Sequence, residues 1–142
     1  MTLITTTAEL HAHLAKYSDL YFAKIEGVAF PKGPLPNLAE ATFQDCDFNG
    51  SSTFGGDITS AQFVDCRMTN MTLSRAHLFG AQFIRCDLSG TRFEDCDLSA
   101  AEFIDCTIAT TRFHHCDFEA AQARGCDVEI AGLIPGVAAL AA

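Results

Sequence analysis

Residues 81–100 read AQFIR CDLSG TRFED CDLSA, four five-residue units with a large apolar residue at the third position of each. Two residues before each large residue lies a small one, which is Ala, Cys or Thr here. The same register runs without a break from Leu38 to Leu133, where Thr53 and Ala123 replace the large residue. A fixed internal period decides the architecture, so it is considered before other features.

A period of five fits neither a continuous helix nor a continuous strand. In an α-helix, residues five apart lie about 140° apart around the axis, so the large residues would spread over every face. In a strand, residues five apart point to opposite sides of the sheet. The pattern is satisfied if the chain turns a corner every five residues, because residues two apart lie on the same side of an extended segment. We therefore expect the small and the large residue of each unit to face one interior.

The units within residues 81–100 follow the pattern small–Asp/Asn–Leu/Phe–x–x and resemble the pentapeptide-repeat family. The resemblance implies an all-β fold, a right-handed quadrilateral parallel β-helix with four units per coil. At twenty residues per coil, residues 36–135 would form about five coils. Coils stack at the spacing of strands in a sheet, which gives a rod roughly 24 Å long.

The sequence divides into three parts, residues 1–35, the β-helix of residues 36–135, and residues 136–142. In the first part, Thr7 to Lys16 predicts a short amphipathic helix with a Thr cap and an acidic residue in its first turn. We expect this part to cover the first coil as a cap, with a recognition element as the alternative. The last part is a cap or a dimer contact, because some members of the family pair two rods end to end through an apolar C-terminal segment. The residues of that contact would be Leu133, Ile134, Val137 and Leu140.

All seven cysteines occupy the small position of a unit. Their spacings are multiples of ten and never the C-x-x-C pairing that metal and redox sites use. A free Cys packs as a small hydrophobe, and a reducing compartment keeps it free. We interpret the cysteines as structural thiols, with metal or redox chemistry as the alternative. They are Cys46, Cys66, Cys86, Cys96, Cys106, Cys116 and Cys126.

Residue volumes alternate along the interior of the repeat. Cys mostly goes with Leu, Ile or Met, whereas Ala or Thr usually goes with Phe. This alternation keeps the volume of each layer nearly constant, as a close-packed interior requires. Thr53 breaks the rule, and we expect the neighbouring Phe54 to turn inward at a local bulge.

Outward-facing residues twenty apart should stack into columns. Val64, Ile84 and Ile104 form one exposed aliphatic column on this reasoning. Three apolar residues in line are unusual on a surface, although single ones are normal. The column is our candidate protein-contact surface, and a tolerated β-branched surface is the alternative. Acidic residues flank it at Asp45, Asp65 and Asp105.

Two other sides carry acidic rows that could imitate a phosphate backbone. The alternative is local, because an Asp just before the large residue can bond nearby backbone in an Asx turn. The candidate row residues are Asp47, Asp87 and Asp127 on one side, and Asp57, Asp97, Asp117 and Glu119 on the other.

The fourth side is mixed in charge, and we do not expect it to bind nucleic acid because Glu94 and Asp95 lie among its basic residues. His114-His115 and His11-x-His13 lack a third ligand at suitable spacing, so we expect solvated histidines and no metal site. The basic residues of this side are Arg75, Arg92, Arg112, His114 and His115.

The formal net charge of −9 disfavours direct binding to nucleic acid or to an anionic membrane. The start of the chain does not resemble a secretory signal, and no apolar stretch is long enough to span a bilayer. These features predict a cytoplasmic protein. Catalytic motifs are missing, and a filled β-helix offers no concave pocket, so we expect neither an enzyme nor a cofactor.

Two functions remain. The first is a protein–protein adaptor or scaffold that acts through the outer faces of the rod. The second follows from the resemblance to the Qnr and MfpA members of the family, which implies a DNA-mimicking regulator of DNA gyrase that counters quinolones. The unbroken register differs from the Qnr pattern, in which loops interrupt the repeat. The expected partner is therefore another protein, with a topoisomerase as one option and a C-terminal homodimer as a second feature.

Overall fold

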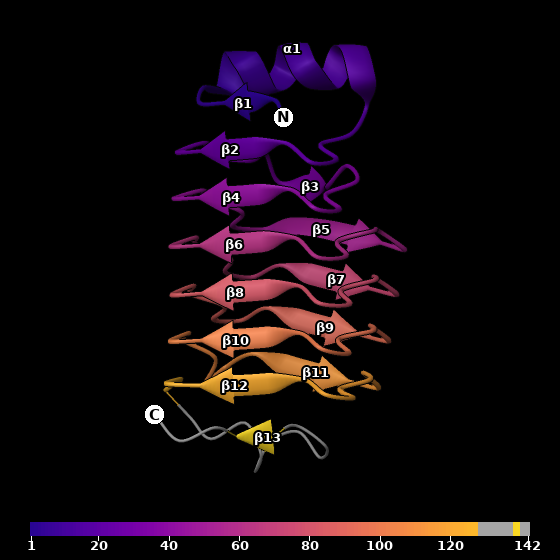
Figure 1. Ribbon diagram of the computed structural model, residues 1–142, viewed down its shortest axis with the longest axis vertical. Helices are drawn as coiled ribbons and strands as arrows, with labels where there is room; N and C mark the ends of the chain where they lie inside the picture. The colour runs from indigo at the N-terminus through magenta and orange to yellow at the C-terminus, as the bar shows by residue number, and fades with distance from the viewer. Residues whose placement is uncertain (128–137, 140–142) are drawn as a thin grey trace.

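The computed structural model describes residues 1–127 and 138–139 of the chain. They form a parallel β-solenoid of about six turns with one short helix at its N-terminal end (Figure 1). Stacked arrows on two sides of the rod in Figure 1 are the two parallel sheets. The expected all-β, parallel β-helical fold is therefore confirmed.

The coil has four sides, which we number in chain order. Side 1 is an eight-stranded sheet and side 3 a five-stranded sheet, whereas sides 2 and 4 stack through isolated bridges, such as Asp47 to Arg67 on side 2 and Asp57 to His77 on side 4. The strands of side 1 are β1 (Leu3–Ile4), β2 (Lys24–Glu26), β4 (Thr42–Gln44), β6 (Gln62–Val64), β8 (Gln82–Ile84), β10 (Glu102–Ile104), β12 (Gln122–Arg124) and β13 (Ala138–Ala139). Those of side 3 are β3 (Gly33–Pro34), β5 (Ser51–Phe54), β7 (Thr72–Ser74), β9 (Arg92–Glu94) and β11 (Arg112–His114).

The twenty-residue register holds wherever two full repeat coils meet. Phe63 pairs with Phe83, and Phe83 pairs with Phe103. The turn that precedes the repeat is shorter by two residues, because Ile25 pairs with Phe43. The coils therefore begin before residue 36, and the expected number of about five is corrected to about six. Residue 36 marks only the start of the unbroken five-residue spacing.

The interior is a stack of aromatic and small side chains. The rings of Phe43, Phe63, Phe83 and Phe103 lie nearly parallel on side 1, with centroids 4.9, 5.2 and 4.9 Å apart. Each of these rings is almost completely inaccessible to solvent. Phe63 and Phe83 each lie between two other rings of this stack. The stack therefore stabilises the rod through both buried apolar area and aromatic contacts.

The prediction for Phe54 was wrong. Its side chain is 75% exposed, whereas Thr53 points inward and is 7% exposed. Strand β5 pairs regularly with β7, Thr53 with Leu73 and Phe54 with Ser74, so no bulge forms. Backbone pairing with the next coil fixes the register more strongly than one large side chain can, because a bulge would break the ladder.

The N-terminal segment covers the first turn of the rod (Figure 1). Helix α1 (Thr7–Tyr17) begins after Thr6, whose side chain accepts a hydrogen bond from the backbone of Glu9, and Glu9 in turn accepts from the Thr5 backbone at 2.9 Å. Leu10 of the helix and Ile4 of β1 belong to the core. The predicted helix is present, and β1 pairs with the edge of β2. Among the described residues, no helix has the length and apolar character that crossing a membrane requires.

Candidate protein-interaction surface

The aliphatic column lies on side 1, where the chain places Val64, Ile84 and Ile104 directly above one another. Val64 pairs with Ile84, and Ile84 pairs with Ile104. The predicted stacking is therefore present, but the three side chains are half-buried rather than exposed. Outward residues on a sheet shield one another along the column, which lowers the exposure of each. Gln44 and Arg124 continue the column at its two ends.

An amide ladder runs beside the column on the same sheet. The Nε2 atom of Gln62 donates to Gln82 Oε1 at 2.6 Å, and Gln82 Nε2 donates to Glu102 Oε1 at 3.3 Å. Each side chain is held by the equivalent residue of the next coil, so the ladder forms an ordered polar border. A surface with fixed side chains loses little conformational entropy when a partner binds.

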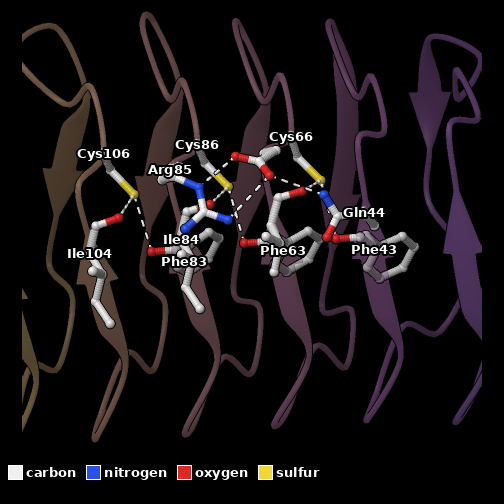
Figure 2. Close-up of polar contacts among 12 residues, drawn as sticks. Phe43, Gln44, Phe63, Cys66, Phe83, Ile84, Arg85, Cys86, Ile104 and Cys106 are labelled. Atoms are coloured by element: carbon white, nitrogen blue, oxygen red, sulfur yellow. Dashed lines mark hydrogen bonds and ion pairs between the residues drawn. The ribbon is translucent and has the colours of Figure 1, made fainter.

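The other border is an ion pair between two coils (Figure 2). Arg85 contacts both carboxylate oxygens of Asp65, with Nε 2.7 Å from Oδ1, and Gln44 Nε2 donates to Asp65 Oδ2 at 3.0 Å. The Arg85 and Gln44 hydrogen bonds hold the pKa of Asp65 below its ordinary value. The column therefore lies between two polar borders, and the flanking acids Asp45 and Asp105 lie beyond the ion pair along the same edge.

The acidic rows are interrupted by residues of other kinds. On side 2, Arg67 lies between Asp47 and Asp87 and is 3.3 Å from Asp47 Oδ2. On side 4, His77 lies between Asp57 and Asp97. Among the row residues within residues 1–127, only Asp97 and Asp117 are neighbours in successive coils. Each row therefore holds fewer carboxylates than it would if every coil carried an acidic residue at that position.

Most row carboxylates also have a local structural role. The Oδ1 atom of Asp47, Asp57, Asp87, Asp97 or Asp117 accepts from the backbone N–H two residues later, at 2.9 to 3.0 Å. These contacts are Asx turns, the local structural role that was the alternative to imitation of a phosphate backbone. Asp127 differs, since it accepts from the backbone of Ile108 at 2.7 Å. Glu119 has an exposed side chain.

The cysteines act as hydrogen-bond donors within the core (Figure 2). Each Sγ lies near the carbonyl oxygen of the large residue one coil earlier, for example Cys86 to Phe63 at 3.2 Å and Cys106 to Phe83 at 3.1 Å. The offset is 23 residues for six of the cysteines and 21 for Cys46, because the turn before the repeat is two residues shorter. All seven are free thiols. The neighbouring thiols of Cys106 and Cys66, together with burial, raise the pKa of Cys86. A neutral thiol that donates to a carbonyl is a poor nucleophile and a poor metal ligand.

The histidines do not assemble with other ligands in the part of the chain that the structure describes. No group of three or more His, Cys, Asp or Glu side chains in residues 1–127 has the arrangement of a metal site. His13 Nε2 lies 2.9 Å from the backbone oxygen of Asp19, at the junction of the helix and the first turn. His115 Nδ1 lies 3.7 Å from Asp95 on side 3.

Two phenylalanines of the described repeat, residues 36–127, are exposed, which the sequence analysis did not predict. Phe54 on side 3 and Phe79 on side 4 are 75% and 51% exposed. The Arg75 guanidinium lies 5.4 Å from the centre of the Phe54 ring. Both residues occupy the fourth position of their unit, as Val64 does. Because this position faces outward, it could have predicted that both rings are exposed. The proposed dimer residues Leu133, Ile134, Val137 and Leu140 lie outside the described residues.

Comparison with known proteins identifies the class to which this rod belongs. The profile of the pentapeptide repeat region matches residues 56–133, more than half of the chain. The chain therefore belongs to the pentapeptide-repeat family. Comparison with curated protein sequences gives no match.

Solved structures show the same fold at low sequence identity. HetL, a pentapeptide repeat protein involved in heterocyst differentiation regulation in the cyanobacterium Nostoc sp. strain PCC 7120, aligns with 78% of this chain at 19% identity and a TM-score of 0.56. The chain spans only 57% of the length of HetL. Full-length QnrB1, a plasmid-mediated fluoroquinolone resistance protein, aligns with 98% of this chain and 92% of its own length at 14% identity, with a TM-score of 0.53.

Proposed function

We propose that the protein is a non-catalytic scaffold that binds another protein through side 1 of the rod. The observation that carries the proposal is the stack of Val64, Ile84 and Ile104 in adjacent strands, bordered by ordered polar ladders. A linear apolar strip between polar rims has the composition of a protein interface. The family includes proteins with regulatory rather than enzymatic descriptions, such as HetL, which supports a binding role.

The column supports this role better than the acidic rows do. Most row carboxylates form Asx turns, and Arg67, His77 and Thr107 interrupt the rows. The column residues have no such task, since their side chains point outward from strands whose ladders are complete without them. The fold does not require apolar residues at these three positions, so they reflect either a binding function or the tolerance of the surface for β-branched residues.

The test is capture of partners from the native cell by the immobilised rod. The variant Val64→Thr/Ile84→Thr/Ile104→Thr keeps the β-branched shape that suits strands while it removes apolar surface. A matched control, Phe54→Ser/Phe79→Ser, removes exposed apolar surface elsewhere. We expect the column variant to lose a partner that the wild type and the control retain. Equal capture by all three folded proteins would exclude side 1.

A DNA gyrase regulator is the second candidate, and one observation favours it. The side 4 units within residues 36–120 carry five carboxylates, at Glu40, Asp57, Asp97, Asp117 and Glu119, and no lysine or arginine. The similarity to QnrB1, a fluoroquinolone resistance protein, adds support at the level of the fold. Purified protein at micromolar concentration should then alter gyrase supercoiling or restore it in ciprofloxacin. Unchanged supercoiling in both assays would remove this candidate.

We further propose a cytoplasmic location and end-to-end pairing of two rods through Leu133, Ile134, Val137 and Leu140. The seven free thiols support a reducing compartment. Fractionation of the native cell tests the first proposal. Sedimentation of the wild type against Leu133→Asp/Leu140→Asp tests the second, with a monomeric wild type as the result that would refute it.

A further inference from the structure

Two successive units on side 3 differ in the residues that balance an arginine. Residues 91–95 read TRFED and residues 111–115 read TRFHH. The two units lie in register, so that Arg112 pairs with Arg92 and His114 pairs with Glu94. The second unit therefore repeats the arginine and replaces both acids by histidines.

The replacement leaves the second unit with a net positive charge, because Arg112 has no acid in its own unit. Arg92 forms an ion pair with Glu94, with Nη2 3.2 Å from Oε1. Among residues 1–127, no carboxylate lies within ion-pair distance of Arg112. Like charges directly opposite one another in a sheet are destabilising, so the stacked Arg92 and Arg112 favour the arrival of an anion.

The same residues line a groove on the outer surface. Its volume is about 560 Å³, and it is lined by the paired residues Arg92 and Arg112, Glu94 and His114, and Phe93 and Phe113, of which Phe93 is completely buried. The arginine and histidine side chains are exposed, so their donors are accessible. A guanidinium fork matches the oxygens of phosphate or sulfate, and an imidazolium across the groove supplies a further donor.

We propose that this groove binds a tetrahedral oxyanion, a phosphate or sulfate group, through Arg112 and the protonated imidazole of His114. The site lies on the sheet opposite the aliphatic column, so it does not depend on the proposed scaffold function. Charge-assisted hydrogen bonds from two exposed donors would give a dissociation constant on the order of 1 mM at low ionic strength. Salt should weaken the binding.

The proposal predicts that binding depends on pH, because an imidazole changes charge between pH 5 and 8. Every charged group around His114 in the described residues bears on this change. These groups are Glu94 and Arg92 on β9, Arg112 on the same strand, and His115, whose ring centre is 4.0 Å away. Asp95 lies 3.7 Å from His115.

Sulfate is the appropriate first probe because it does not itself titrate over this range. We expect sulfate to shift the ring-proton NMR signal of His114 in a saturable manner, with at least fivefold tighter binding at pH 5.5 than at pH 8. His114→Gln assigns the signal, and isothermal calorimetry measures the affinity of variants without that histidine. Inorganic phosphate and O-phosphoserine, titrated at pH 5.5, distinguish a free anion from a phosphorylated side chain, and saturable binding of either supports the site.

Reciprocal variants separate the site from general charge effects. His114→Glu recreates the pairing of the preceding unit and should abolish binding, as should Arg112→Gln. Glu94→His extends the cationic cluster and should tighten binding at pH 5.5 severalfold. Arg124→Gln removes an equal charge from side 1 and should have no effect. Binding that is unchanged in folded His114→Glu or Arg112→Gln protein, or lost equally in Arg124→Gln, would overturn the proposal, as would no saturable binding by the wild type.

Discussion

The thiol of Cys106 lies 3.1 Å from the carbonyl oxygen of Phe83, a residue one coil earlier and 23 positions back. The hydroxyl of Thr111 donates to Leu88 at the same offset with a distance of 2.7 Å, and Thr91 donates to Met68. The small position of the repeat is therefore a donor position as well as a packing position. This double requirement explains why Cys, Thr and Ser share it with Ala.

Removal of the donor should destabilise the rod more than its replacement by another donor. We expect Cys106→Ala to lower the free energy of unfolding by about 1–2 kcal/mol, because it loses both volume and a hydrogen bond. Cys106→Ser should lose less, since a hydroxyl can donate to the Phe83 carbonyl. Urea unfolding measures both. Equal losses would mean that the thiol contributes only by packing.

The buried thiol of Cys86 should make the protein less stable in alkali. The pKa of Cys86 is raised above its ordinary value of 9.0 by the neighbouring Cys106 and Cys66 thiols and by burial. Above pH 9 the unfolded chain loses this proton while the folded chain keeps it, so stability falls as pH rises. Below pH 8 the thiol should contribute no pH dependence. Chemical unfolding at pH 8 and pH 10 should show a smaller decrease for Cys86→Ala than for the wild type, and identical decreases would contradict this account.

Two phenylalanines should differ strongly in their contribution to stability. Phe83 is completely buried, and its ring lies between those of Phe63 and Phe103. We expect Phe83→Ala to cost about 3–5 kcal/mol. Phe54→Ala removes a side chain that is 75% exposed and should change stability by less than about 0.5 kcal/mol. Thermal or urea unfolding distinguishes them, and a large loss for Phe54→Ala would indicate that its ring packs inward in solution.

The Asx turns should tolerate loss of charge but not loss of the side-chain oxygen. Asn37 already accepts from the backbone of Ala39 at 2.8 Å, as Asp97 accepts from Ser99 at 2.9 Å. Asp97→Asn should therefore be nearly neutral, whereas Asp97→Ala should cost about 1 kcal/mol. Urea unfolding is the measurement, and a loss for Asp97→Asn as large as for Asp97→Ala would assign the stabilisation to charge. If the prediction holds, Asn substitutions can neutralise the acidic rows in the gyrase assay without unfolding the rod.

The sequence predicted the fold, the interior and the column because one fixed spacing governs all three. Phe63, Phe83 and Phe103 follow from the register alone, as does the stacking of Val64 on Ile84. Phe54 was misplaced because side-chain size was given more weight than the ladder between coils. The extra turn before residue 36 was missed because its five-residue spacing, at Leu20, Ile25 and Phe30, is out of register with the spacing that begins at Leu38.

The surface was harder to predict because it depends on pairs of side chains in different coils. The bond from Gln62 to Gln82 and the contact between Arg85 and Asp65 join residues twenty apart whose rotamers the sequence does not specify. The groove beside Arg112 was also missed. The sequence showed the basic residues of side 3, but the contrast between Glu94 and His114 matters only once the two are in register.

The unvarying twenty-residue register between β4 and β12 means that the length of this molecule is quantised. One added or deleted block, such as residues 81–100, changes the rod by about 4.8 Å and leaves every neighbouring pairing of the same kind. A change of another size alters the pairing between coils unless a corner absorbs it, as happens in the 18-residue turn in which Ile25 pairs with Phe43. Over evolution, such a chain can therefore change its length in steps of one coil while each surface column keeps its direction.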